Sequence, residues 1–193
     1  IDYSLFKREL FRDLVKRNSK KIRIARQQEL EEITTDHAYQ RELQNLDKNV
    51  KLALFKKSQK LIDRFLFIFF AEDRGLLTPN STLQILEKWK ADLDFGDERP
   101  LYSLFKQYFN YLDNGRKGTS SRTEIYAYNG GLFQPDSILD GLEIDDDLLY
   151  RHTLKLAKYD FESQVDVNIL GHIFENSLNE IESVNAEIEG AEF

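Results

Sequence analysis

Seven consecutive residues near the middle of the chain, Phe65 to Ala71 (FLFIFFA), carry no polar side chain. A helix with one face in water shows a polar residue every few positions, so a helix that is apolar all round must be covered all round. The run is far shorter than the roughly 20 residues that cross a bilayer, and charged residues bracket it. The pattern predicts a central buried helix over about 50–74, with Gly75 as its C-cap.

The charged residues that bracket this run are the first candidates for function. They have two interpretations: structural ion pairs at the ends of a buried helix, which we favour, and an acidic active site. The candidates for structural ion pairs are Asp63, Arg64, Glu72, Asp73 and Arg74.

The amino-acid composition limits which covalent links and metal sites the chain can form. The chain has no cysteine, so it has no disulfide and no thiolate metal site, as expected of a cytoplasmic protein. Its three histidines lie far apart without ligand spacing, which argues against a zinc site. No targeting segment is present. The chain has no methionine and begins at Ile1, so we interpret it as a piece of a longer protein.

The formal net charge of -7 is unevenly distributed. Residues 1–26 include nine basic and three acidic residues, whereas residues 136–193 include three basic and fifteen acidic residues. This distribution excludes a surface that coats DNA uniformly, but it permits a local basic arm.

The basic arm coincides with a predicted amphipathic helix over residues 3–17, in which apolar residues recur at helical spacing. Four basic residues recur every four positions away from the apolar stripe: Arg8, Arg12, Lys16 and Lys20. Such a row can neutralise phosphates without reading bases. We favour a solvated face, and contact with DNA phosphates is the alternative.

A second basic segment is the loop NGRKGTSSR, which contains Arg116, Lys117 and Arg122. It lacks the G-x-x-x-x-G-K-[ST] spacing of a phosphate-binding P-loop. We interpret it as a mobile surface loop, with a flexible phosphate contact as the second interpretation.

The other segments are also mainly helical. Residues 21–48 predict a polar helix that breaks near Thr34-Thr35. Ser81 and Gln84 have the spacing of a capping box, and the helix after them places Trp89 in the core. Further helices are predicted from Pro100 to Asn114, from Leu148 to Lys158 after the cap Asp145-Asp146-Asp147, and from Val167 to about Glu182 after the cap Asp166.

Together these patterns predict an all-α fold, a helical bundle around the central helix, with at most one short β-hairpin near 124–134. In that hairpin residues 124–128 form the strand and residues 129–131 the turn. We expect an N-terminal helical arm over 1–48, a helical core domain over 49–182, and an acidic tail or linker over 183–193.

Three blocks in the same order resemble one family: SQKLIDRFLFIFFAEDRGLL, YNGGLFQPDSILDGLEIDDDLL and YDFESQVDVNILGHIFENSLNEIE. They are similar to the helical connector of bifunctional type IIG restriction–modification enzymes and to methyltransferases of BREX-type phage-exclusion systems. The resemblance implies a parent with an N-terminal endonuclease and an S-adenosylmethionine-dependent, adenine-specific DNA methyltransferase, and the tail or linker over 183–193 would lead to that methyltransferase domain. It implies S-adenosylmethionine and Mg²⁺ as the parent's cofactors, and double-stranded DNA and the flanking domains as the partners of this chain.

Catalytic motifs of such a parent do not occur in this chain. No Asp or Glu stands two positions before a lysine, as a restriction nuclease centre requires, and the three prolines are isolated, so the Pro-Pro motif of an adenine methyltransferase is missing. We therefore predict a non-catalytic connector that positions the catalytic domains on DNA. Two alternatives stay open: a module that contacts DNA phosphates through its basic N-terminal helix, and a protein-interaction module with an acidic C-terminal face.

Overall fold

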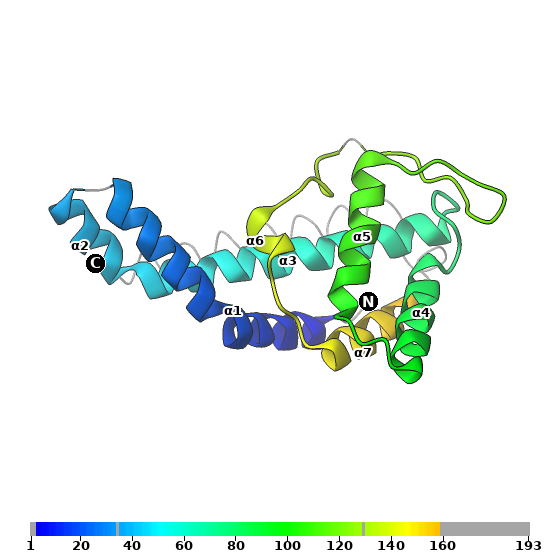
Figure 1. Ribbon diagram of the computed structural model, residues 1–193, viewed down its shortest axis with the longest axis horizontal. Coiled ribbons are helices and arrows are strands. Elements are labelled where there is room, and N and C mark those ends of the chain that lie inside the picture. The colour runs from blue at the N-terminus through cyan, green and yellow to red at the C-terminus, as the bar shows by residue number, and fades with distance from the viewer. Residues whose placement is uncertain (1–2, 34, 129, 159–193) are drawn as a thin grey trace. The chain divides into compact units, whose positions relative to one another are not determined.

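The computed structural model describes residues 3–33, 35–128 and 130–158. Within these ranges the fold is all-α, as predicted from the sequence (Figure 1). The elements, in chain order, are α1 (Ser4–Ile33), α2 (Asp36–Gln44), α3 (Leu46–Asp73), α4 (Ser81–Phe95), α5 (Leu101–Asn114), α6 (Ser137–Asp140) and α7 (Asp146–Ala157). The predicted helix from Val167 to Glu182, its cap Asp166 and the tail over 183–193 lie outside the described residues.

The chain divides into two compact units between Gln59 and Lys60, a boundary that lies inside α3. The first unit contains α1, α2 and the start of α3. α1 is longer than the predicted helix over 3–17 and ends at Ile33, close to the predicted break. Thr35 then takes the N-cap position of α2, although its side chain makes no capping hydrogen bond. In this unit the rings of Phe11 and Phe55 meet at right angles, with centroids 5.5 Å apart.

The predicted central helix is confirmed as α3. From Leu61 to Glu72 every side chain is buried except those of Asp63 and Phe67, which are half-buried. Gly75 ends the helix with a positive φ of 75°. Its N–H donates to the Glu72 carbonyl at 3.2 Å and the Leu76 N–H donates to the Ala71 carbonyl at 2.8 Å, which is the hydrogen-bond pattern of a Schellman cap.

Aromatic side chains cover the second half of α3 within the second unit. The ring of Phe65 meets those of Phe105 and Phe109 on α5, at centroid distances of 5.0 and 5.8 Å. On another side, Phe67 meets Tyr128 and Phe133 from the long connection between α5 and α6, at 5.3 and 5.5 Å. The connection therefore packs against the central helix as part of the core.

The helices α4, α5 and α7 pack against one another in pairs. Trp89 is buried, as predicted, 5.7 Å from the ring of Tyr150 on α7. The predicted acidic cap is also confirmed: Asp145 accepts a hydrogen bond from the Leu148 N–H at the start of α7. Asp146 accepts one from the Leu101 N–H at 2.9 Å, so the same acidic triplet satisfies the start of α5.

The residues around 124–128 pair differently from the predicted hairpin. Ile125 forms an isolated antiparallel bridge with Arg116, which precedes it in the chain, so the turn that joins the paired residues precedes the predicted strand. The Tyr128 N–H donates to the Leu112 carbonyl at 2.8 Å, which fastens the far end of this segment to α5. Among the described helices none is long and apolar enough to cross a membrane.

Candidate nucleic-acid contacts and buried charged groups

Arg64 is the largest buried polar side chain on the central helix, and only 1% of its surface is exposed. Its guanidinium donates to the backbone carbonyls of Leu132 and Gln134, at 2.8 and 2.9 Å. It also lies over the rings of Phe109 and Phe133, at 5.0 and 5.8 Å. Burial lowers the pKa of Arg64, and the nearby Tyr102, Asp140, Asp136 and Asp113 oppose that effect. The sequence suggested an ion pair for Arg64, whereas in the structure its guanidinium contacts neutral carbonyls and aromatic ring faces.

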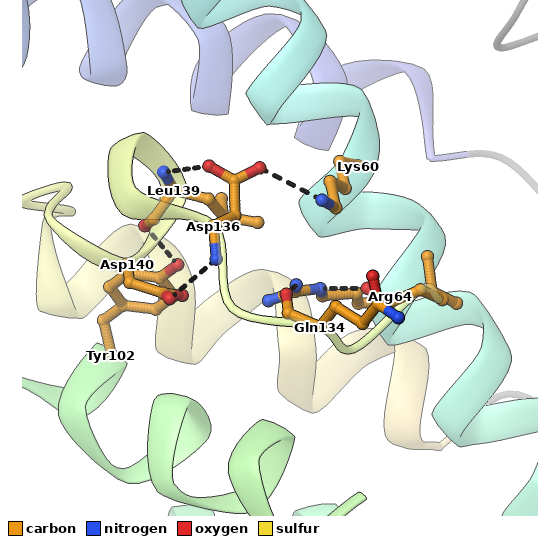
Figure 2. A network of polar contacts seen from close by, with 8 residues as sticks. Lys60, Arg64, Tyr102, Gln134, Asp136, Leu139 and Asp140 are labelled. Atoms are coloured by element: carbon orange, nitrogen blue, oxygen red, sulfur yellow. Dashed lines mark hydrogen bonds and ion pairs between the residues drawn. The ribbon is translucent and has the colours of Figure 1, made fainter. Parts of the chain in front are cut away.

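A second set of polar contacts fixes the same connection one helical turn earlier on α3 (Figure 2). Lys60 pairs with Asp136 at 3.0 Å. Asp136 in turn accepts from the Leu139 N–H at 3.0 Å and so caps α6, while its own N–H donates to Asp140 at 3.0 Å. The Tyr102 hydroxyl donates to the Leu139 carbonyl at 2.8 Å. Lys60 and Arg64 thus hold the connection at two successive turns of α3.

Glu72, at the other end of the buried run, is held by hydroxyls and an amide. Its Oε1 accepts hydrogen bonds from Ser81 Oγ, from the Thr82 N–H at 2.8 Å and from Thr82 Oγ1 at 2.9 Å. Ser81 Oγ also bonds the Tyr108 hydroxyl at 2.8 Å. Burial raises the pKa of Glu72, and the Ser81 and Thr82 hydrogen bonds offset only part of that rise. Burial likewise raises the pKa of Tyr108 to about 12.

This arrangement corrects the predicted capping box of Ser81 and Gln84. Asn80 is the N-cap residue of α4, in a left-handed conformation and without a side-chain capping bond. Ser81 is already helical, and its hydroxyl is engaged with Glu72 and Tyr108. The carboxylate that satisfies an N–H in the first turn of α4 comes from α3, where a negative charge also suits the helix dipole. No local spacing in the sequence signals this contact.

The other charged residues that bracket the apolar run lie nearer the surface. Asp63 and Asp73 are half-buried, and Arg74 is exposed with its guanidinium 5.0 Å from the ring of Phe70. Three hydrogen bonds fix one carboxylate oxygen of Glu72 to the start of α4, although burial still raises its pKa. The geometry of Arg64 and Glu72 therefore favours a structural role for both.

The basic row predicted near the N-terminus lies on one continuous helix, because α1 runs without a break past Lys20. Its four members are all exposed, whereas Phe6, Leu10 and Leu14 of the same helix are buried. Members of the row follow one another at about 6 Å along the helix axis. Asp13 lies between them in the sequence, but it pairs with Arg17 at 2.7 Å.

The structure places the three cations of the second basic segment in different environments. Lys117 and Arg122 are exposed. Arg116 is half-buried, with its guanidinium 5.0 Å from the ring of Tyr111 and its Nη2 donating to the Thr123 carbonyl at 3.0 Å. The stacked and hydrogen-bonded Arg116 therefore contributes to the loop's own structure.

The described histidines do not form a metal centre: His37 is exposed and His152 is buried. Groups of three or more His, Cys, Asp or Glu side chains placed to hold a metal ion were not found among the described residues.

Comparison with known proteins gives one informative match. Residues 56–133 match the family described as "MmeI, helicase spacer domain". No curated protein and no solved structure matches the chain significantly. The matched range begins on α3 and ends in the connection after α5. It includes Glu72 with its partners Ser81 and Thr82, and Arg64 with its partner Leu132, whereas Gln134, the other carbonyl partner of Arg64, lies one residue beyond it. The match supports a helical spacer region of a type IIG restriction–modification enzyme, in agreement with the resemblance seen in the sequence.

The contacts of Arg64 predict a large effect for a conservative change. Arg64→Lys keeps the charge but removes the planar fork that reaches two carbonyls and stacks on rings. We expect the free energy of unfolding to fall by about 3 kcal/mol, the scale of two charge-assisted hydrogen bonds. Urea unfolding followed by the fluorescence of Trp89, the sole tryptophan, measures it within the second unit. Arg74→Lys, the same change at the exposed position directly after the same helix, is the control and should stay within about 0.5 kcal/mol.

The environment of Glu72 predicts a pH effect on stability. Because burial raises its pKa in the folded protein above the ordinary 4.5, the folded state keeps a proton that the unfolded state has already lost. Stability from this group is therefore full below pH 4.5 and falls as pH rises through the folded pKa. Glu72→Gln keeps an oxygen that can accept all three hydrogen bonds and cannot ionise. Urea unfolding over a pH series should show the variant gaining stability relative to the parent above pH 4.5, and parallel curves would contradict this assignment.

Proposed function

We propose that this chain is a non-catalytic helical connector in a DNA restriction–modification enzyme, and that it holds the catalytic domains at a fixed separation on DNA. The match of residues 56–133 to a spacer family carries the proposal. In such an enzyme the flanking domains would be an endonuclease and an S-adenosylmethionine-dependent adenine-N6 DNA methyltransferase. The cofactors S-adenosylmethionine and Mg²⁺ belong to those domains, and a relation to BREX-type methyltransferases is part of the same proposal.

The way the second unit is built suits a spacer. A spacer transmits position only if its segments cannot shift against one another. Here the connection between α5 and α6 is fastened to α3 by Lys60, Arg64 and Phe67, and the start of α4 is fastened to the end of α3 by Glu72. Close-packed contacts of this kind respond to strain as a unit, because protein interiors have low compressibility.

The proposal predicts that loosening this unit alters where the enzyme cuts. Phe67→Ala removes a ring that meets Tyr128 and Phe133 and should lower the free energy of unfolding by about 3 kcal/mol. In a full-length enzyme that carries the substitution, end mapping of the cleaved DNA should show a broader distribution of cut positions or lost cleavage. The control Phe95→Ala changes a ring that is 85% exposed and should leave the cut positions sharp. Unchanged cut positions in a Phe67→Ala enzyme with measured loss of stability would contradict the proposal that this chain holds the catalytic domains at a fixed separation.

A second function, contact with DNA phosphates, is favoured by the basic row on α1. Arg8, Arg12, Lys16 and Lys20 are exposed on one helix, opposite its buried stripe. Among the described residues no carboxylate pairs with any of the four. An uncompensated row of cations binds the phosphate backbone through counterion release, independently of base sequence.

This second function predicts a specific salt dependence. Fluorescence anisotropy of the 193-residue chain with a nonspecific DNA duplex should show affinity that falls with salt. Changing all four members of the row to Gln should make the slope of log affinity against log salt shallower by about 4, close to one for each contact. The charge-matched control changes four exposed basic residues of the first unit outside the row to Gln: Arg41, Lys48, Lys51 and Lys56. Equal slopes for the two variants would show that the row has no special role.

A further inference from the structure

A groove of about 790 Å³ lies within the second unit, between the start of α4 and the chain from Arg116 to Tyr126. The segment from Gly75 to Pro79, between α3 and α4, completes its wall. Three cationic side chains line it, Lys88, Arg116 and Arg122, against one carboxylate, that of Glu124. The groove is therefore locally basic in a chain whose formal net charge is -7.

Arg116 is the fixed cation of this groove. Its Nη2 donates to a neutral carbonyl, that of Thr123, and its guanidinium lies over Tyr111. Its Nε is buried and has no hydrogen-bond partner. Within the described part of the chain no carboxylate pairs with Arg116. A buried donor without a partner is rare in proteins. The contacts with Thr123 and Tyr111 hold the guanidinium in place, and they do not neutralise its charge.

The other two cations extend from the rim into solvent. A hydrogen bond from the Arg122 N–H to Thr119 Oγ1 at 3.1 Å holds the backbone there in a turn, and the Arg122 side chain is exposed. Lys88 pairs with Asp92 at 2.8 Å, and its side chain remains 56% exposed. Exposed pairs of this kind contribute at most about 1 kcal/mol, so Lys88 can exchange its carboxylate for a phosphate at little cost.

An exposed aromatic ring lies beside these cations. Tyr126 is 74% exposed and Leu76 is 62% exposed, and both line the groove. Ser81 and Tyr108, whose hydroxyls bond each other, also line it. Cations that follow a backbone, together with an aromatic face, are the features with which proteins bind a nucleic-acid strand without reading its sequence.

We propose that this groove binds the sugar–phosphate backbone of a DNA strand, with phosphates on Lys88, Arg116 and Arg122 and a sugar or base against Tyr126. The choice of DNA rests on the proposed function. Phosphate is the shared chemistry, and its sources are a duplex, a single strand or the free ion. Glu124 opposes the three cations and limits the affinity of the groove.

The test measures fluorescence anisotropy of the 193-residue chain with a labelled duplex and with one of its strands alone, over a salt series. The double variant Lys88→Gln/Arg122→Gln leaves the structural Arg116 in place. It should bind DNA about tenfold more weakly at 50 mM salt, with a salt slope shallower by about 2. The matched control is Lys90→Gln/Lys117→Gln, which removes one exposed cation from the same helix and one from the same loop, both outside the groove. Control binding that falls as far as that of the groove variant would overturn the proposal.

Two further variants test the aromatic face and the opposing charge. Tyr126→Ala should weaken binding of the single strand about fivefold or more, whereas Phe95→Ala, which removes another exposed ring, should not. Glu124→Gln should strengthen binding. A Tyr126→Ala chain that binds the single strand as the parent does would remove the stacking role and overturn the proposal as stated.

A titration with inorganic phosphate tests whether the groove binds the free ion instead of DNA. If 10 mM phosphate at matched ionic strength raises the melting temperature of the parent but not of the groove variant, and DNA binding is equal in both, the groove binds free phosphate and the DNA proposal is wrong. The connector role does not depend on this result, because cut positions in the full-length enzyme test it separately. DNA binding by the groove and the sharpness of the cut positions can therefore fail independently, and each result tests one proposal only.

Discussion

The second half of α3 is apolar on nearly every side, and the fold of the second unit follows from the need to cover it. Cover comes from α5 through Phe105 and Phe109, and from the connection after α5 through Tyr128 and Phe133. Arg64 adds a polar condition, because burying a guanidinium costs several kcal/mol unless its donors are satisfied. Two carbonyls meet that condition only if the connection passes α3 at the level of Arg64. The buried charge therefore fixes where an otherwise irregular segment lies.

Sequence patterns predicted those parts of the fold that depend on local physics. The run from Phe65 to Ala71 has no polar face, and burial on all sides followed directly. Gly75 was identified as a cap because a left-handed residue after a helix strongly favours glycine. Asp145 was identified because a carboxylate at a helix start satisfies N–H groups a few residues away. In each case the cause and its effect lie within one or two helical turns.

Contacts between distant residues were not predictable in the same way. The carbonyl partners of Arg64 lie 68 and 70 residues further along the chain, and the sequence showed only that the charge needed a partner. The Ser81–Gln84 spacing indicated a capping box, but Ser81 and Thr82 are buried beside Glu72 and donate to its carboxylate, which would otherwise be buried without hydrogen-bond partners. The bridge between Arg116 and Ile125, and with it the groove, likewise depends on tertiary packing. Charge counting placed Arg116, Lys117 and Arg122 in one loop, but it did not separate the structural cation from the exposed ones.

Two features explain how a chain with a net negative charge presents basic surfaces: many of its acidic residues lie toward the C-terminal end of the sequence, and others are used at helix starts. Asp136, Asp145, Asp146 and Glu72 are all engaged at helix starts, where they satisfy backbone N–H groups. Asp136 also pairs with Lys60, whereas Asp146 and Glu72 have no cationic partner among the described residues. Within the described residues neither the row on α1 nor Arg116 has a carboxylate partner, and basic residues there outnumber acidic ones by 27 to 24. The charge of each surface therefore depends on which charged side chains lie there and which of them are already paired or hydrogen-bonded. The net charge of the whole chain is a poor guide to what its separate faces can bind.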